Sequence, residues 1–159
     1  GYKVVIITNQ SGIYRQYFNW NDYEKVTERL LSKCGKSIPI DAIYANGFGP
    51  NIRENNWRKP SPEMLFEAKR DLKIDLNNSI IFGDRETDLL AGYRAGLKLL
   101  VHVKTGHGRK ERGKLLEKLI FNNVMNTYSF GLTKKNESEV IFIDNLSEFL
   151  NLKKLKISL

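Results

Sequence analysis

The sequence predicts an α/β layer fold built on a mostly parallel sheet, and two observations carry that prediction. Short apolar runs rich in β-branched residues recur along the chain, as expected of strands that are covered on both faces. Segments with the apolar spacing of amphipathic helices separate these runs. Such alternation is typical of βαβ units, whose strands are parallel.

The first part of the chain is expected to supply two strands and one helix. Residues 4–7 form a continuous apolar run and predict the first strand. The helix expected at residues 22–34 carries its apolar side chains on one face, at Tyr23, Val26, Leu30, Leu31 and Cys34. Residues 40–44 read as a second strand, which leads into a loop rich in Gly, Asn and Pro.

A second helix is expected to begin at Ser61. Serine is a favourable capping residue, Pro62 suits the first helical position, and Glu63 meets the positive end of the helix dipole. This helix is expected to direct four side chains inward, those of Met64, Leu65, Ala68 and Leu72.

The second half continues the alternation. A strand at residues 79–82 ends at Gly83-Asp84, and the next helix runs through Leu89, Leu90 and Tyr93 to a stop at Gly96. Further strands are expected at residues 99–103 and 140–143, and a closing helix at residues 146–152. Residues 104–139 are less regular and predict either an insertion or a helix with long loops. Because no repeat or low-complexity linker interrupts the chain, we expect residues 1–159 to form a single domain.

Composition narrows the class of protein. Apolar residues make up 41% of the chain and charged residues 28%, an ordinary globular balance. No apolar run approaches the roughly 20 residues of a membrane helix, and no signal-peptide pattern is present, so we expect no membrane partner. Cys34 is the only cysteine, which favours a cytoplasmic location. The net charge of +8 fits either an anionic partner or a lysine-rich solvated surface, and the second is favoured.

Three polar clusters are candidates for chemistry. Thr8-Asn9-Gln10-Ser11-Gly12 follows the first strand, where hydroxyl and backbone N–H groups can hold phosphate oxygens, although a plain turn would look similar. Arg58-Lys59-Pro60 precedes the second helix, and its lysine could neutralise a phosphoryl group. Gly83-Asp84-Arg85-Glu86-Thr87-Asp88 places two carboxylates beyond a buried strand. That pair suits Mg²⁺, or else a turn residue followed by a helix-capping acid.

Together and in this order, the three clusters resemble the second, third and fourth motifs of haloacid dehalogenase-like phosphatases. The resemblance covers residues 1 to about 110 and is strongest to the heptose bisphosphate and histidinol phosphatases. It implies a Rossmann-like three-layer sandwich, bound Mg²⁺, and hydrolysis through an aspartyl-phosphate intermediate. It also implies roles for individual residues: catalytic Thr8 and Lys59, substrate-binding Asn9, Ser11, Arg15 and Arg58, and metal-binding Asp84 and Asp88.

The sequence departs from the family pattern in two places. The family nucleophile belongs to an Asp-x-Asp motif on a strand before the first one here, and this sequence contains no such motif. We therefore expect an upstream central strand to carry it. Many relatives also have a Cys/His zinc loop before the Arg-Lys-Pro motif, but residues 45–57 contain neither residue type. We expect a zinc-free loop anchored by Phe48 and Trp57.

The expected partner is a small phosphorylated metabolite, a sugar bisphosphate first and histidinol phosphate second, acted on by a monomer or homodimer. Two alternatives stay open: a nucleic-acid 3′-phosphatase, which the motifs do not favour, and an inactive phosphate-binding relative. His102 is expected at or near the surface, whereas His107 either lies there too or approaches the site. The basic stretch Arg109, Lys110, Arg112 and Lys114 predicts a solvated helix face.

Overall fold

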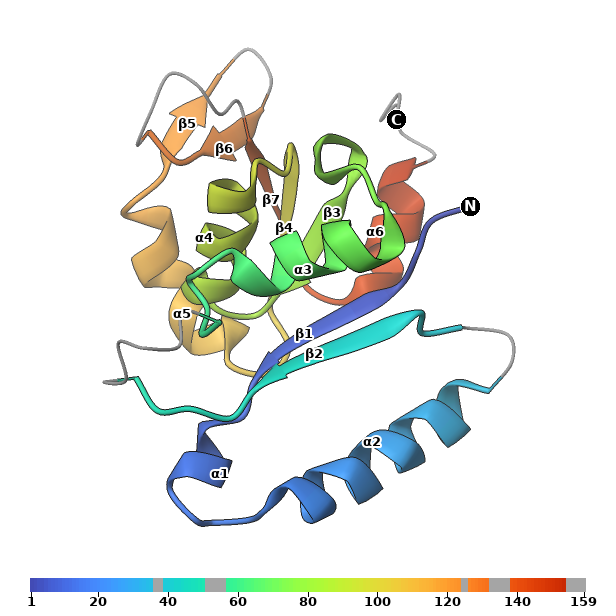
Figure 1. The fold of residues 1–159 in the computed structure, drawn as a ribbon. Helices are drawn as coiled ribbons and strands as arrows, with labels where there is room; N and C mark the ends of the chain where they lie inside the picture. Colours follow the sequence, from blue (N-terminus) through green and yellow to red (C-terminus); the bar gives the residue numbers. More distant parts are fainter. Residues whose placement is uncertain (36–38, 51–56, 124–125, 132–137, 154–159) are drawn as a thin grey trace. The chain divides into compact units, whose positions relative to one another are not determined.

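The structure, a computed structural model, describes residues 1–35, 39–50, 57–123, 126–131 and 138–153. Of residues 151–153 it describes the backbone only. The chain divides into two compact units, Gly1–Ile74 and Asp75–Leu159. Strands and helices alternate along both units (Figure 1). The predicted α/β class with mostly parallel strands is therefore confirmed, while the prediction of a single domain stays a prediction.

The first unit contains a two-stranded parallel sheet. Its strands are β1 (Val5–Asn9) and β2 (Ala42–Asn46), paired in register from Val5 opposite Ala42 to Asn9 opposite Asn46. Three helices accompany them: α1 (Ser11–Tyr14), α2 (Trp20–Cys34) and α3 (Glu63–Leu72). Both strands extend two residues beyond the predicted ends, so Thr8 and Asn9 belong to β1 and not to the turn after it.

Helix α2 begins where a reciprocal cap forms. The side chain of Asn19 accepts from the Asp22 N–H at 3.0 Å, and the Asp22 carboxylate accepts from the Asn19 N–H at 3.1 Å. The predicted apolar face is present, yet no residue of α2 is buried within the described part of the chain. Val26, in the middle of that face, is 68% exposed.

The predicted serine cap of helix α3 is wrong. Its N-cap position is Pro62, which provides no side-chain cap, and the Ser61 hydroxyl is buried without a hydrogen bond to a described group. The inward face is as predicted for Met64, Leu65 and Ala68, while Leu72 is only half-buried. Met64 and Ala68 pack with Tyr44 of β2 in a small core, against which Trp57 and Ile74 lie.

The second unit contains a five-stranded sheet with the order β3-β4-β7-β6-β5. Its members are β3 (Ile80–Gly83), β4 (Leu99–Val103), β5 (Ile120–Asn122), β6 (Thr127–Ser129) and β7 (Glu139–Ile143). Strands β3, β4 and β7 are parallel, and β6 and β5 extend the sheet in antiparallel fashion. The antiparallel pair lies in the region that the sequence left undefined.

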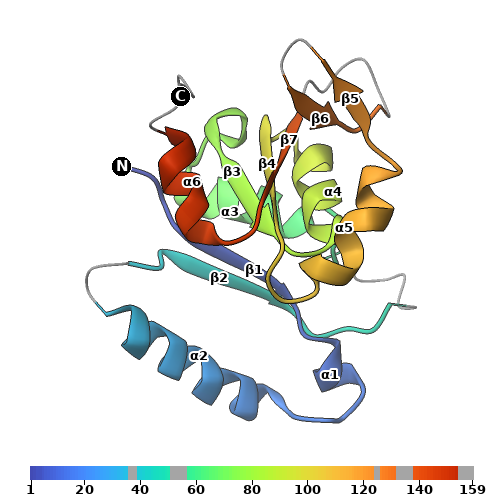
Figure 2. The same ribbon diagram turned by 180° about the vertical axis from the view of Figure 1, so that it is seen from behind.

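Helices cover both faces of this sheet (Figure 2). They are α4 (Glu86–Ala95), α5 (Gly108–Leu116) and α6 (Leu146–Lys153). Ile81 lies against Gly92 of α4, and its neighbour Phe82 packs edge-on against Phe149 of α6 at 4.9 Å between ring centroids. Because successive residues of a strand point to opposite faces, α4 and α6 pack on opposite sides of β3. Gly96 ends α4 in a left-handed conformation, as predicted.

Strand β4 lies in the centre of the second unit's core. All five of its residues are buried. Leu99, Val101 and Val103 pack with Ile143 and Phe149 on one side. Strands β1 and β3 each pair with a single described strand, β2 and β4 respectively. The upstream strand that the family resemblance implies stays a prediction. Within the described residues, no helix has the length and apolar character needed to cross a membrane.

Candidate phosphate and metal site

The first polar cluster lies at the carboxyl end of β1. The Thr8 hydroxyl accepts a hydrogen bond from the Gln10 side-chain amide at 3.1 Å, and the Gln10 N–H donates to the Asn46 carbonyl at 2.7 Å. Ser11 opens the four-residue helix α1, and Arg15 follows that helix on the exposed surface. In parallel sheets ligands bind at this edge, and Thr8 and Ser11 lie at it, while their roles toward phosphate stay predictions.

Lys59 is attached to this strand end by three hydrogen bonds. Its backbone N–H donates to Asn9 Oδ1 at 3.1 Å, and its carbonyl accepts from Asn9 Nδ2 at 3.2 Å. Its ammonium group donates to the Ile7 carbonyl at 2.9 Å. The structure thus brings the second polar cluster to the first across 50 residues of sequence. The side chain of Asn9, predicted as a substrate ligand, is hydrogen-bonded to the Lys59 main chain, and its role as a ligand stays a prediction.

Of the two aromatic anchors predicted for the loop before Lys59, the structure confirms one. Trp57 packs edge-on against Tyr44 at 6.2 Å between ring centroids, so it is an anchor. Phe48 is 43% exposed and is not one, which corrects the expectation for that residue. The Phe48 carbonyl accepts from Arg58 at 3.3 Å. The prediction that Arg58 and Arg15 contact substrate stays untested, and residues 51–56 of the loop lie outside the described part.

Asp84 follows β3 in the second unit and is bound by His107. The His107 backbone N–H donates to Asp84 Oδ2 at 2.7 Å, and its ring Nδ1 lies 3.3 Å from the same oxygen. Partial burial raises the pKa of Asp84, but these hydrogen bonds outweigh burial and leave that pKa below its usual value. Asp84 is therefore a carboxylate at neutral pH. The open alternative that His107 approaches the predicted site is the correct one.

Glycine is required beside Asp84. Gly106 has a φ of +60°, and a Cβ added to it would lie 2.3 Å from Asp84 Oδ2. Any side chain there would displace the carboxylate and strain the backbone. The sequence left open whether His107 approaches the site, because its contact with Asp84 spans 23 residues and no local pattern could assign it.

Asp88 makes the contacts of a helix-capping residue. It is 6% exposed, and its Oδ2 accepts from the Arg85 N–H at 3.1 Å at the start of α4. A Cβ on Gly83 would lie 2.3 Å from the Asp88 Cβ, so the strand end and the helix start approach closely there. The capping interpretation describes Asp88, and its metal role stays a prediction.

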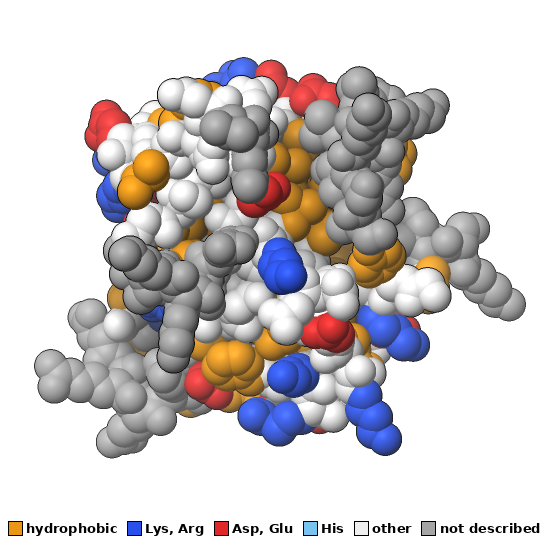
Figure 3. Space-filling view, turned by 90° about the horizontal axis from the view of Figure 1, so that it is seen from above, with side chains coloured by type: hydrophobic (Ala, Val, Ile, Leu, Met, Phe, Trp, Pro, Cys, Tyr) orange, Lys and Arg blue, Asp and Glu red, His pale blue; other side chains and the backbone are white. Residues whose placement is uncertain are grey.

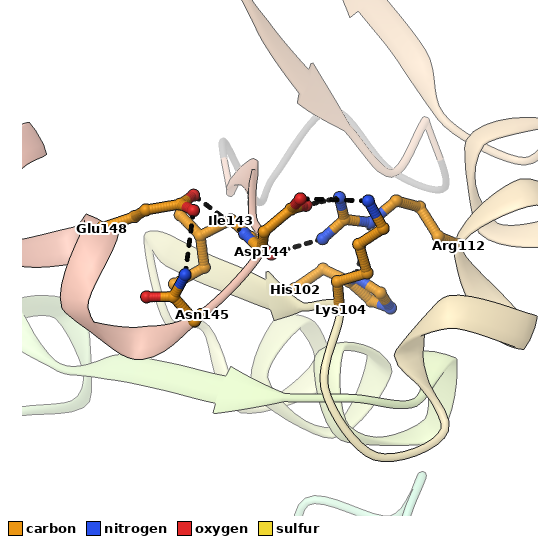
Figure 4. A network of polar contacts seen from close by, with 7 residues as sticks. All are labelled: His102, Lys104, Arg112, Ile143, Asp144, Asn145 and Glu148. Atoms are coloured by element: carbon orange, nitrogen blue, oxygen red, sulfur yellow. Dashed lines mark hydrogen bonds and ion pairs between the residues drawn. The ribbon is translucent and has the colours of Figure 1, made fainter.

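A polar network beyond β4 and β7 was missed by sequence analysis (Figure 4). Arg112 of α5 reaches the His102 ring at 3.4 Å, Asp144 at 2.8 Å and the Ile143 carbonyl, and Lys104 donates to Asp144 at 3.0 Å. His102 is fully buried and not near the surface as expected. Arg112 is half-buried, so it departs from the solvated face predicted for the basic stretch.

Electrostatics fix the charge states of this network. Burial, followed by the positive charge of Arg112, lowers the pKa of His102, so the imidazole is neutral at pH 7. A neutral ring can accept the Arg112 hydrogen bond through Nδ1. Hydrogen bonds from Lys104 and Arg112 lower the pKa of Asp144. The network joins α5 to the ends of β4 and β7, close in sequence to Gly106 and His107.

Sequence comparisons decide which family these features belong to. The profile of the HAD-hydrolase-like family matches residues 56–127. The D-glycero-beta-D-manno-heptose-1,7-bisphosphate 7-phosphatase of Haemophilus influenzae is 34% identical over 131 residues, covering 79% of this chain and 71% of that protein. The chain belongs to the HAD-like hydrolase family.

A relative with the same name and a solved structure extend the match. The Pasteurella multocida enzyme is 40% identical to this HAD-like chain over 120 residues, which cover 72% of the chain and 65% of the enzyme. The chain thus spans slightly less than two thirds of that relative. A D,D-heptose 1,7-bisphosphate phosphatase from B. bronchiseptica, solved with magnesium and phosphate, superposes with a TM-score of 0.72 at 25% identity. The superposition covers 97% of this chain and 75% of that one.

The structure therefore shows the surroundings of each HAD-like motif within its own unit. Lys59 is bonded to Asn9 and Ile7 at the end of β1, the strand that also carries Thr8, and Asp84 contacts His107 in the second unit. Their convergence on one pocket stays a prediction. The described residues contain no group of three or more His, Cys, Asp or Glu side chains arranged to hold a metal, and the metal role of Asp84 stays a prediction.

Proposed function

We propose that this protein is a Mg²⁺-dependent phosphatase that hydrolyses a phosphomonoester of a small sugar bisphosphate, such as D-glycero-D-manno-heptose 1,7-bisphosphate. The observation that carries the proposal is the attachment of Lys59 to the end of β1 beside Thr8. A hydroxyl and an ammonium group at the carboxyl edge of parallel strands suit a phosphoryl group. The names of the relatives support the choice of sugar.

Within this proposal, residues of the first unit receive the phosphoryl group. Thr8 donates its hydroxyl hydrogen to a phosphoryl oxygen, and the Lys59 ammonium offsets the negative charge that the phosphoryl oxygens carry. Ser11, at the start of α1, adds a hydroxyl or backbone N–H. Arg58 and Arg15 are candidates for the remaining substrate groups, including a second phosphate. The attacking carboxylate belongs to the Asp-x-Asp motif, which this sequence does not contain.

The second unit supplies the proposed metal ligand. Asp84 is ionised and one third exposed, and both bonds from His107 fall on Oδ2. An accessible carboxylate oxygen fits Mg²⁺, which commonly takes one or two protein carboxylates and keeps several waters. When bound, the ion would neutralise charge on the phosphoryl oxygens. His107 holds the Asp84 carboxylate in place, and Asp88 fixes the helix start behind it.

The face drawn in Figure 3 does not favour a nucleic-acid substrate. On the face in Figure 3, Lys and Arg side chains stand among acidic and hydrophobic ones and do not form one continuous strip. A duplex-binding surface normally concentrates positive charge along the path of the phosphate backbone. The mixture of charges on this face fits the solvated surface that was favoured as the source of the net charge of +8.

The decisive experiment measures phosphate release by the full-length protein from four substrates. These are heptose bisphosphate, histidinol phosphate, a generic aryl phosphate and a 3′-phosphorylated oligonucleotide, each with and without Mg²⁺. We expect the heptose bisphosphate to have the highest kcat/KM and activity to vanish when Mg²⁺ is chelated. Preference for histidinol phosphate or the oligonucleotide would replace the proposed substrate, and no release from any of the four would indicate an inactive binding protein.

Asp84→Asn tests the metal ligand. The amide keeps the shape and can still accept from the His107 N–H, but it lacks the charge that attracts Mg²⁺. We expect a loss in kcat/KM of about 100-fold or more, with the fold intact and only a small decrease in the urea midpoint, because the bonds from His107 favour the charged carboxylate. Asp75→Asn is the matched control, because Asp75 caps the short 3-10 helix Leu76–Asn78 in the same unit. Ordinary Mg²⁺-dependent turnover by the Asp84 variant would rule out this ligand.

A further inference from the structure

Asn9 makes an unusual pair of contacts for a residue expected to bind substrate. Its side-chain amide bonds both backbone groups of one residue, Lys59, accepting from the N–H at 3.1 Å and donating to the carbonyl at 3.2 Å. This arrangement matches the way a neighbouring antiparallel strand bonds both backbone groups of one residue. The amide of Asn9 therefore acts as a one-residue extension of β1 toward the Lys59 main chain.

We infer that Asn9 is a positioning residue, which acts on the phosphoryl group through Lys59 and not by direct contact. The inference rests on the proposed function, because it concerns how Lys59 is presented to the substrate. The family resemblance implied that Asn9 binds substrate directly. In this inference Asn9 instead holds Lys59, which binds the substrate.

The position of the Lys59 ammonium is determined at both ends of the residue. Asn9 fixes its backbone, and the ammonium donates to the Ile7 carbonyl at 2.9 Å, two residues earlier on β1. A lysine side chain is long and has many rotamers, so it loses much conformational entropy when it is held in one of them. Holding the backbone and the ammonium against the same strand restricts that freedom before substrate binds. A group already in place stabilises the transition state without an ordering cost at that moment.

The hydrogen-bond capacity of Asn9 supports the same conclusion. An asparagine amide has one oxygen acceptor and two N–H donors. The oxygen and one donor face Lys59, so the edge that carries both atoms is turned toward the main chain. A phosphoryl group has only acceptor oxygens and could use only the remaining donor. The amide is thus committed mainly to Lys59.

A double-mutant cycle distinguishes positioning from direct binding. We would measure kcat/KM of the full-length protein with heptose bisphosphate for Asn9→Ala, Lys59→Met and the double variant. We expect the Asn9 variant to lose about 10- to 100-fold, mostly in kcat, and the Lys59 variant to lose more. If Asn9 acts through Lys59, adding Asn9→Ala to Lys59→Met changes kcat/KM by less than about twofold. Losses that multiply in the double variant would overturn the inference.

Asn19→Ala provides the matched control. Asn19 is another asparagine of the first unit whose side chain bonds a backbone N–H, at the cap of α2. Its removal lowers stability without touching Lys59, so kcat/KM is expected to stay within about twofold of wild type. A similar kinetic loss in both alanine variants would show that Asn9 matters only through general stability. Asn9→Ser replaces Asn9→Ala in the cycle if the alanine variant does not fold.

Hydrogen exchange tests the contact without relying on turnover. The Lys59 amide, bonded to Asn9 Oδ1, is expected to exchange slowly in wild type and at least about tenfold faster in Asn9→Ala. Fast exchange of this amide in wild type would overturn the inference whatever the activity. A protected amide in a protein that hydrolyses none of the phosphate esters would support the contact and overturn the proposed function alone.

Discussion

The two units bury their parallel strands to different degrees. In β4 of the second unit all five residues are buried, and Leu100 and Val101 have no exposed surface. In β1 of the first unit all five residues are only half-buried. The described core of the first unit centres on Tyr44, Met64 and Ala68.

This difference indicates two ways of holding a functional group. Lys59 is held beside β1 by hydrogen bonds to Asn9 and Ile7. Asp84, in contrast, follows a strand that is packed against α4 and α6. Apolar burial dominates folding stability, whereas a single hydrogen bond contributes about 1 kcal/mol. Substitutions in the second unit's core should therefore act mainly on stability, and those around Lys59 mainly on kinetics.

The largest expected effect comes from truncating one isoleucine in each unit. Ile81 of β3 is 6% exposed, whereas Ile6 of β1 is half-buried. We expect Ile81→Ala to lower the free energy of unfolding by about 3–4 kcal/mol and Ile6→Ala by about 1–2 kcal/mol. Urea titration of both variants measures the difference. Equal losses in the free energy of unfolding would contradict the difference in burial between the two units. They would show that β1 is covered by residues beyond those described.

A glycine pair sharpens the comparison inside the second unit. A Cβ on Gly92 of α4 would lie 2.7 Å from Ile81 and 2.9 Å from Leu100, whereas one on Gly113 of α5 would meet nothing within 4 Å. We expect Gly92→Ala to cost about 1–3 kcal/mol through overpacking, despite the better helix propensity of alanine. Gly113→Ala is expected to stabilise by up to about 1 kcal/mol. Thermal or urea unfolding gives both values, and a stabilised Gly92 variant would show that this core can expand.

The same contrast in burial explains which parts of the fold the sequence could predict. β4 was predicted with its observed ends because a strand buried on both faces is continuously apolar. The prediction for His102 was wrong, because its alternation with two valines predicted a position at or near the surface although the strand is covered on both sides. The hairpin of β5 and β6 was missed because its strands are three residues long and β5 is exposed.

Candidate site residues could be found from motifs, but their contacts could not. Thr8, Lys59 and Asp84 stand out beside strand ends and a helix start, where local rules apply. The bond between Asn9 and Lys59 joins residues 50 apart, and the contact of His107 with Asp84 spans 23. Such contacts depend on how the elements pack, which no local pattern encodes.

A smaller effect is expected at the core of the first unit. The Tyr44 hydroxyl donates to Asp71 at 2.8 Å, and burial together with this bond raises the pKa of Tyr44 to about 12. Tyr44→Phe should cost about 1 kcal/mol at pH 7. An unfolded tyrosine ionises near pH 10, so the bond's contribution is complete below pH 10 and is lost as pH rises toward 12. Urea titrations at several pH values should show that the difference in the free energy of unfolding between wild type and Tyr44→Phe decreases over this range. Tyr17→Phe is the control, since Tyr17 is 75% exposed. If the difference in the free energy of unfolding between wild type and Tyr44→Phe stays constant with pH, the hydrogen bond between Tyr44 and Asp71 does not make this contribution.

The smallest effect is expected on α2, whose apolar face is uncovered in the described residues. Val26 lies on that face and is 68% exposed. Val26→Thr keeps the β-branched shape and nearly the same helix propensity while adding a hydroxyl, so it changes little besides polarity. At an exposed position the free energy of unfolding should shift by no more than about 0.5 kcal/mol. A loss above about 1 kcal/mol would mean that Val26 is buried in the full-length protein, because a hydroxyl is costly only where water is excluded. The first unit would then share the apolar burial of the second, and the contrast between the two ways of holding a functional group would disappear.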